Sequence, residues 1–463
     1  MTAKAYFEDN RQRFLDELFA LLRIPSVSTA SEHDDDTHFC ATKVQEYLVK
    51  AGLDEVSLYP TDGHPVVYAE KIIDPALPTV LVYGHYDVQP AAPLEQWESE
   101  PFEPVIKPTP AHPDGAIFAR GATDDKGQMF IHVKAVECMI QTNSLPCNVK
   151  FMIEGEEEIG SPNLGPFIRQ YTDMLQSDVI LISDTSLLSK EDPSITVGLR
   201  GMSYNDVKVT AADKDMHSGT YGAGVPNPIN ILCDMVAALK DDKKHITIPG
   251  FYDDVVLPPA EVRAMLQNAP FNAEEHMAGP GLRGLEGEEG YNFYERTGIL
   301  PSLDCNGIWG GYTEEGSKTI IPAVANAKIS MRLVSKQDHH QATQQFTDYF
   351  KSLAPDTVEV EVHPHHGGNP YVTPTDTVEY RAASAAMEET FGKTPVPMYG
   401  GGSIPIVYEF HQVLGVDILM MGFGLDSDGL HSPNEHFGVW NFFKGVETVP
   451  VFFARYAALK SAR

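Results

Sequence analysis

Apolar residues near the N-terminus recur with the spacing of one helix face. In the segment 6–22 they are Phe7, Phe14, Leu15, Leu18, Phe19 and Leu22. Residues three, four and seven positions apart share a face of an α-helix, so this segment is predicted to be helical. Further helices are predicted over residues 38–51 and 128–142.

Short, almost continuous apolar runs follow, and they alternate with helical stretches. These runs cover residues 79–83, 149–153, 179–182 and 418–421. Strands that are buried on both faces have this pattern, which is typical of a parallel sheet between helices. The sequence therefore predicts an α/β domain with a mostly parallel sheet flanked by helices.

The middle of the chain has a different pattern. Residues 203–211 and 327–334 alternate between apolar and polar side chains, as strands with one wet face do. The Gly- and Glu-rich stretch 272–298 between them is predicted to be a long surface excursion. We expect one α/β domain from residues 1–200 and 376–463, and an inserted α+β domain with an antiparallel sheet at 201–375.

Composition and charge exclude several classes of protein. The chain has 463 residues, 42% of them apolar, so a sizeable core is available. The net charge of −31 would repel phosphate backbones, so no nucleic-acid partner is expected. No apolar run approaches the ~20 residues that span a bilayer, so no membrane partner is expected either.

The cysteines and the first residues bear on the compartment. The sequence MTAKAYFEDNRQRF lacks the apolar stretch of a signal peptide. Five cysteines occur without a CxxC pair, and we expect buried free thiols in a reducing compartment. The predicted location is cytoplasmic. The cysteines are Cys40, Cys138, Cys147, Cys233 and Cys305.

Polar clusters follow the predicted strands or lie in nearby loops. They are His85 with Asp87, the adjacent acids Asp124 and Asp125, the run Glu156–Glu158, Asp184, and His431. Taken singly, each has a simpler explanation: a turn, a helix N-cap or a solvated acidic loop. In an open α/β sheet, however, the carboxyl ends of parallel strands meet at one edge, where sites are built.

Together these clusters form a candidate metal centre. They place His85, Asp124, Glu158, Asp184 and His431 at one edge of the sheet. Imidazole and carboxylate groups in this mixture suit divalent metals, and structural sites more often use cysteine. In the acidic run, one carboxylate could bind metal while its neighbour acts as a general base. The pattern therefore points to catalysis.

With these residues, the chain resembles the carnosinase-like cytosolic non-specific dipeptidases of the aminoacylase/carboxypeptidase superfamily of di-metal peptidases. The matching stretches run in family order along nearly the whole chain. They are GHYDVQP (84–90), RGATDDKG (120–127), EGEEEIGSPNL (154–164), ISD (182–184), GLRGMSY (198–204), DMHSGTYG (215–222), KTIIPAVANAKISMRLV (318–334), GGSIP (401–405) and DGLHSPNE (428–435).

The resemblance implies two divalent ions per subunit, zinc or alternatively manganese. His85 and Asp184 would bind one ion, Glu158 and His431 the other, and Asp124 would bridge them. Glu157 would activate a bridging water, and Asp87 would orient His85 or the base. A cis peptide between Asp124 and Asp125 is implied as well.

The resemblance also implies a homodimer, with residues 201–375 as the lid and dimerisation domain. His217 would be donated in trans to the partner's site. The expected substrate-binding residues are Thr319, Arg332, His366, Gly402 and Ser403.

The implied function is hydrolysis of the peptide bond of dipeptides, or of similarly short peptides with a free C-terminal carboxylate. The alternative is a deacylase or carbamoyl hydrolase of N-acyl amino acids, with the same metals and another acyl pocket. A catalytically inactive relative would lack Glu157 or a ligand, and the sequence has all of them.

Overall fold

The computed structural model describes residues 2–278, 281–402 and 404–462. The chain folds into two compact units. The first consists of Met1–Val197, Thr373–Pro397 and Glu409–Arg463, and the second of Gly198–Val372 and Met398–Tyr408. The first unit thus combines both ends of the chain, and the second is built from its middle.

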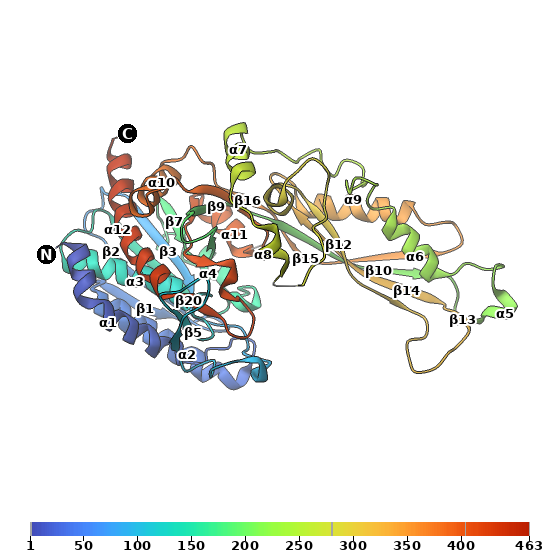
Figure 1. Cartoon of the computed structure of the whole chain (residues 1–463), viewed down its shortest axis with the longest axis horizontal. Helices are drawn as coiled ribbons and strands as arrows, with labels where there is room; N and C mark the ends of the chain where they lie inside the picture. Colours follow the sequence, from blue (N-terminus) through green and yellow to red (C-terminus); the bar gives the residue numbers. More distant parts are fainter. Residues whose placement is uncertain (1, 279–280, 403, 463) are drawn as a thin grey trace. The chain divides into compact units, whose positions relative to one another are not determined.

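The main sheet has the strand order β1-β2-β6-β3-β7-β18-β9-β16, with β17 also pairing β9. Strands β1, β2, β3, β7, β9 and β16 are labelled in Figure 1. Its inner strands β3, β6, β7 and β18 pair in parallel, whereas β1, β2, β9 and β16 pair antiparallel. The strands are β1 (Glu55–Tyr59), β2 (Val66–Lys71), β3 (Thr79–His85), β6 (Asn148–Glu154), β7 (Val179–Ile182), β9 (Ser194–Leu199), β16 (Tyr371–Val372), β17 (Val396–Gly400) and β18 (Asp417–Met420).

Helix α3 (Lys126–Gln141) lies at the centre of the first unit. Every residue from Lys126 to Met139 is buried, and the helix packs against β3 and three other helices, α1, α2 and α12. Its buried cation Lys134 forms ion pairs with Glu17 and Glu137, which offsets the cost of removing the charge from water. The other helices are α1 (Ala3–Leu22), α2 (Asp34–Ala51), α4 (Leu164–Gln170), α10 (Val378–Phe391), α11 (Pro405–Leu414) and α12 (Val439–Ser461).

Small sheets complete the first unit. Strand β5 (Ala116–Phe118) lies between β4 (Val105–Lys107) and β20 (His436–Gly438), all antiparallel. Strand β8 (Ser186–Leu187) pairs in parallel with β19 (Gly424–Leu425). These pairings tie the loops around the carboxyl ends of the main strands to one another.

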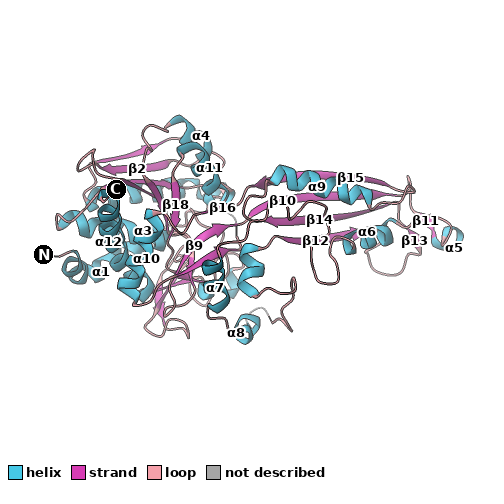
Figure 2. Ribbon diagram, turned by 90° about the horizontal axis from the view of Figure 1, so that it is seen from above, coloured by secondary structure: helices cyan, strands magenta, loops and turns pink. Residues whose placement is uncertain are grey.

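The second unit is built on an antiparallel sheet of order β12-β14-β10-β15 (Figure 2). Along β10 and β14 every second side chain is buried, and these side chains form one core with α6 and α9. Helices therefore cover one face of the sheet, as the alternation predicts. The elements are β10 (Gly201–Thr210), β12 (Ser302–Gly310), β14 (Val324–Leu333), β15 (Glu359–Gly368), α6 (Pro228–Ala237) and α9 (His339–Ser352).

Shorter elements surround this sheet. Strand β11 (Met216–His217) pairs with β13 (Ile320–Ile321), and α5 (Ser218–Tyr221) follows β11 directly. The stretch predicted as a surface excursion contains α8 (Ala273–Ala278) and a short π-helix, Glu295–Ile299, and α7 (Ala260–Asn268) precedes it.

Two expectations differ from the structure. Helix α2 begins at Asp34 rather than at residue 38, because the carboxylates in its first turn favour the helix N-terminus. The prediction that all five cysteines are buried is wrong: Cys40, Cys138 and Cys147 are buried, but Cys233 and Cys305 are exposed. Across the described ranges, no helix combines the length and apolar character that crossing a membrane requires.

Candidate active site

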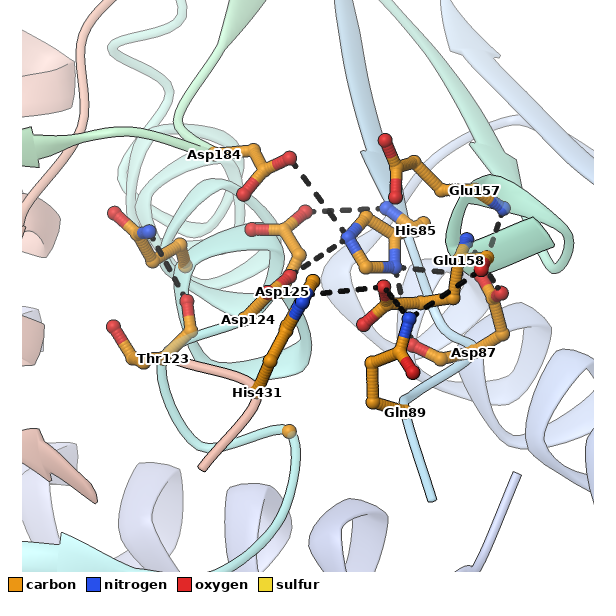
Figure 3. Close-up of polar contacts among 12 residues, drawn as sticks. His85, Asp87, Gln89, Thr123, Asp124, Asp125, Glu157, Glu158, Asp184 and His431 are labelled. Atoms are coloured by element: carbon orange, nitrogen blue, oxygen red, sulfur yellow. Dashed lines mark hydrogen bonds and ion pairs between the residues drawn. The ribbon is translucent and has the colours of Figure 1, made fainter. Parts of the chain in front are cut away.

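Three parallel strands bring the candidate residues to one edge of the main sheet. His85 is the last residue of β3 and pairs with Glu154, the last residue of β6. Strand β7 ends at Ile182, level with Tyr83, and Asp184 follows two residues later. Glu157 and Glu158 come after β6 in a short 3-10 helix. Figure 3 shows the side chains of His85, Asp184, Glu157 and Glu158 together with those of Asp124 and His431.

Asp124 lies between two groups of ligand-type side chains. Its Oδ1 is 3.2 Å from Nε2 of His85, and that nitrogen is 3.9 Å from Oδ2 of Asp184. Its Oδ2 is 2.9 Å from Nε2 of His431, which is 3.2 Å from Oε2 of Glu158. The structure therefore forms two adjacent groups that share one carboxylate. The Asp124–Asp125 peptide is cis, which confirms that prediction.

The side chains in the first group fit a cation. Nε2 of His85 is buried and makes no hydrogen bond within the described residues, although the Asp124 carboxylate lies 3.2 Å away. The opposite nitrogen, Nδ1, lies 3.1 Å from the backbone oxygen of Asp87, a contact that fixes the ring. A metal-binding histidine characteristically presents one nitrogen to the ion while the other donates to an oxygen.

The charge balance of the site also fits divalent cations. Six carboxylates, those of Asp87, Asp124, Asp125, Asp184, Glu157 and Glu158, surround two imidazoles. Burial raises the pKa of Asp184 well above its usual range, and the Asp124 charge adds to the rise. Contacts with Asp124 and Glu158 raise the pKa of His431 to about 10. Bound divalent ions would balance the excess negative charge of these carboxylates.

Glu157 lies beside the two ligand groups but belongs to neither. Burial raises its pKa to about 8, the nearby charge of His85 lowers it, and the Glu158 carboxylate raises it. Its carboxylate accepts no hydrogen bond from any residue that the structure describes. The side chain is thus free to exchange a proton with a bound molecule.

The preceding acid, Glu156, has a different environment. Its carboxylate accepts hydrogen bonds from Nδ2 of Asn163 at 2.9 and 3.0 Å, and from the backbone N–H of His64 at 3.3 Å. These contacts occupy both oxygens of Glu156. They leave Glu157 and Glu158 as the two acids of this run beside His85 and His431.

Asp87 is buried and organises the surrounding backbone. Its Oδ1 accepts from the N–H of Glu157 at 3.2 Å, and its Oδ2 accepts from the N–H of Glu158 at 3.1 Å. Oδ1 also lies 3.3 Å from Nδ1 of His85. Ser28 donates its hydroxyl to Oδ2 at 2.6 Å. One carboxylate thereby positions a ligand histidine and both glutamates.

Several residues that support the site are absent from the set predicted from the sequence. Gln89 donates to Oε2 of Glu158 at 2.9 Å, and Ser28 supports Asp87. Glu435 is fully buried and accepts from the backbone N–H groups of Gly121, Thr123 and Asp124. Their roles depend on contacts between distant segments. Only the positions of Gln89 and Glu435 inside matching motifs could have pointed to them.

Arg120 links the loops that carry the candidate ligands. Its Nη1 donates to Oε2 of Glu435 at 2.6 Å. Its Nη2 donates to the carbonyl oxygens of Pro90, at 3.2 Å, and Ser432, at 3.4 Å. The guanidinium therefore connects the segments around His85, Asp124 and His431.

The remaining predicted site residues lie in the second unit. His217 is exposed at the start of α5, where its Nδ1 accepts from the N–H of Thr220 at 3.2 Å. The carbonyl of Thr319 accepts from the N–H of Ser218, so Thr319 lies beside His217. Arg332 is on β14, between the buried Met331 and Leu333.

The other predicted substrate-binding positions are less fully described. The carbonyl of Gly402 accepts from the N–H of Arg200 at 3.1 Å. His366 belongs to β15, but its side chain lies outside the described part, as does all of Ser403. A neighbouring histidine, His365, pairs with Asp206 at 3.1 Å.

Known proteins resemble the chain along most of its length. It is 34% identical to the Beta-Ala-His dipeptidase of Homo sapiens, over 85% of this chain and 78% of the relative. It is 30% identical to the Cys-Gly metallodipeptidase DUG1 of Saccharomyces cerevisiae, over 96% of both chains. Among solved structures, the M20 family metallo-carboxypeptidase Sso-CP2 of Sulfolobus solfataricus has a TM-score of 0.81 at 30% identity, over 96% of this chain and 99% of that one.

The family pattern gives the same result. The pattern of peptidase family M20/M25/M40 matches residues 81–454, which include every residue of the two ligand groups. The strand-end position of these groups, the shared Asp124 and the relatives of similar length all agree with that match. This chain belongs to peptidase family M20/M25/M40.

Proposed function

We propose that the chain is a dipeptidase that hydrolyses dipeptides, and similarly short peptides, with a free C-terminal carboxylate. The observation that carries this proposal is the position of Asp124, whose two oxygens face two separate imidazole–carboxylate groups. Adjacent sites for two divalent cations, with an unpaired glutamate beside them, suit hydrolysis. The dipeptidase names of the two relatives support the substrate class.

The ligand groups would hold two ions, for which we propose zinc or, alternatively, manganese. His85 and Asp184 would hold one, Glu158 and His431 the other, and Asp124 both. When bound, such a pair lowers the pKa of a water molecule and polarises the scissile carbonyl group. Gln89 keeps the Glu158 carboxylate oriented through its 2.9 Å hydrogen bond.

Glu157 would be the general base and then the general acid. Its carboxylate would accept a proton from the attacking water and then donate that proton to the nitrogen of the leaving amine. Burial raises the pKa of the Glu157 carboxyl, which favours its second role, as the acid that donates a proton to the leaving amine. Asp87 would orient this base through the backbone N–H of Glu157.

We propose that residues of the second unit bind the ends of the substrate. The planar guanidinium of Arg332 would bind the C-terminal carboxylate bidentately. Backbone N–H groups at Gly402 and the hydroxyl of Ser403 would add to this carboxylate site. Thr319 and His366 would contact the rest of the substrate.

We further propose that the working enzyme is a homodimer located in the cytoplasm. His217 of one subunit would hydrogen-bond the developing oxyanion in the partner's site. The exposed position of His217, next to Thr319 and far in sequence from the ligands, is consistent with contact across subunits. The buried free thiols Cys40, Cys138 and Cys147 are consistent with a reducing compartment.

A panel of substrates tests the function. Purified protein, loaded with zinc or manganese, would be assayed with dipeptides, the same dipeptides as C-terminal amides, tetrapeptides and N-acyl amino acids. We expect the highest kcat/KM with free dipeptides and a loss of about tenfold or more with the amides, because a charged hydrogen bond contributes ~1.5–3 kcal/mol. Higher kcat/KM with N-acyl amino acids would identify a deacylase, and higher kcat/KM with longer peptides a carboxypeptidase.

A substitution of Arg332 tests its proposed contact with the C-terminal carboxylate of the substrate. Lysine presents a point charge and cannot replace the planar fork of Arg332. We therefore expect Arg332→Lys to lower kcat/KM for the free dipeptide and to leave the amide almost unaffected. Equal losses on both substrates would argue against a carboxylate contact.

A further inference from the structure

A second group of imidazole and carboxylate side chains lies near the loop that carries His431. His112 comes from the loop between β4 and β5, Asp428 from the 3-10 helix Asp426–Asp428, and His436 from the start of β20. Pairing of β20 with β5, labelled in Figure 1, brings these segments together. The three ligand atoms lie within 4.8 Å of one another, and His112 and Asp428 are buried.

The ring of His436 presents a lone pair to this group. Its Nδ1 lies 2.8 Å from the backbone oxygen of Asn434. A carbonyl oxygen only accepts, so Nδ1 carries the proton and Nε2 of the neutral ring does not. That Nε2 faces Oδ1 of Asp428 at 3.8 Å, which is another acceptor. Stacking on Phe118, with ring centroids 4.6 Å apart, fixes the plane of the imidazole.

The ring of His112 contributes its Nε2 to this group. Its Nδ1 and Oδ1 of Asn441 are both buried without a hydrogen-bond partner in the described ranges. Both lie 2.3 Å from the point where a Cβ on Gly438 would sit, so they are neighbours. The amide of Asn441 is oriented by its Nδ2, which donates to the carbonyl of Phe423 at 2.8 Å.

Nδ1 of His112 and Oδ1 of Asn441 form no hydrogen bond with each other, so this contact does not set the tautomer of His112. Nε2 of His112 and Oδ1 of Asp428 lie 2.6 Å apart and share a proton, which a bound cation would replace. Without that proton, His112, Asp428 and His436 would each have a lone pair on an atom of this group, and the three atoms lie within 4.8 Å of one another. The other oxygen of Asp428 accepts from the N–H of Leu425 at 2.9 Å, so the carboxylate is held in place.

We propose that this group is a third divalent-cation site, with Nε2 of His112, Oδ1 of Asp428 and Nε2 of His436 as its ligands. Two imidazoles and one carboxylate suit zinc and related first-row metals. A shared proton would need only His112 and Asp428, and the lone pair of His436 would then have no role. The side chain of His436 is 12% exposed, which leaves access for a water as the fourth ligand.

The site would act on the loop between its ligands. Asp428 and His436 lie on either side of His431 in the sequence. A cation that holds both, and ties them to His112, would fix the ends of the segment that carries this catalytic-site ligand. The site is separate from the proposed catalytic pair, because it shares no ligand with the two groups around Asp124.

Metal content tests the proposal. Chelator-treated protein would be reloaded with zinc, passed through a desalting column and analysed for zinc per subunit. We expect three ions in the wild type and two in His436→Gln. His365→Gln is the control, because it removes a histidine that pairs with an aspartate in the second unit, and we expect it to keep three. Two ions in the wild type, or three in His436→Gln, would overturn the proposal.

A second measurement leaves the proposed site unchanged. Asp124→Ala removes the carboxylate that both catalytic groups share, so only the third site should bind metal in this variant. Titration with Co²⁺ should then give one equivalent, with the visible absorption of four-coordinate cobalt. Absence of cobalt binding would rule out the site, even if His436→Gln failed to fold.

Discussion

Asp124 places one carboxylate oxygen in each of two ligand groups. A single substitution there would therefore remove a ligand from both ions of the proposed catalytic pair. We expect Asp124→Ala to lose both of these ions and the dipeptidase activity, as measured by elemental analysis and a dipeptide assay. Asp348→Ala, which changes an exposed aspartate of α9, is the control. Retention of both ions by Asp124→Ala would contradict the sharing.

The adjacent residues Glu156 and Glu157 have opposite environments. Hydrogen bonds occupy the Glu156 carboxylate, whereas the Glu157 carboxylate accepts none from the described residues. We expect Glu157→Gln to keep its metal and bind substrate but to lower kcat by ~10²–10⁴-fold or more, the range of general acid–base catalysis. Glu156→Gln is the matched control and should retain most activity. If Glu156→Gln lost activity and Glu157→Gln retained it, the general base would be Glu156 instead.

At the scale of elements, the sequence patterns predict the strands well. The continuous apolar runs correspond to β3, β6, β7 and β18, because a strand buried on both faces tolerates few polar residues. Helix starts are harder to predict. The apolar spacing of α2 begins later than its acidic first turn, so the predicted start is four residues late.

Contacts that support the site could not be predicted in the same way. Arg120 and Glu435 lie 315 residues apart in the sequence. Their hydrogen bond forms only when the N-terminal and C-terminal segments of the first unit pack together. Ser28 reaches Asp87 from a loop with no motif of its own. Residue types at strand ends indicate candidate ligands, but the groups that orient the ligands come from tertiary packing.

The contact between Glu435 and the Asp124 loop gives a prediction at this scale. In Glu435→Gln an amide NH₂ would replace one acceptor oxygen, so either the N–H groups of Thr123 and Asp124, which donate to Oε1, or the N–H of Gly121 and the Arg120 guanidinium, which donate to Oε2, would lose their partner. We expect metal affinity to fall ~10–100-fold, the usual effect of losing a group that orients a ligand. Chelator competition measures this, with Glu447→Gln on α12 as the control. Unchanged affinity would show that the Asp124 loop does not depend on Glu435.

At the scale of the whole molecule, the proposed trans histidine can be tested by mixing subunits. His217→Ala and Glu157→Gln proteins would each be inactive or nearly so. If His217 acts in the partner's site, a mixed dimer regains one intact site, and we expect up to about half of the wild-type activity per heterodimer. Exchange of subunits would be verified by mass spectrometry. No recovery after verified exchange would mean that His217 acts within its own subunit or not at all.

The most direct test of the proposed metal-dependent dipeptidase function is the dependence of dipeptide hydrolysis on metal. Protein stripped by a chelator and verified as folded by circular dichroism would be assayed before and after reloading with zinc or manganese. We expect dipeptide hydrolysis to disappear when the metal is removed and to return when zinc or manganese is added back. In Glu157→Gln it should not return. Hydrolysis at the original rate by the stripped, folded protein would contradict the proposed function.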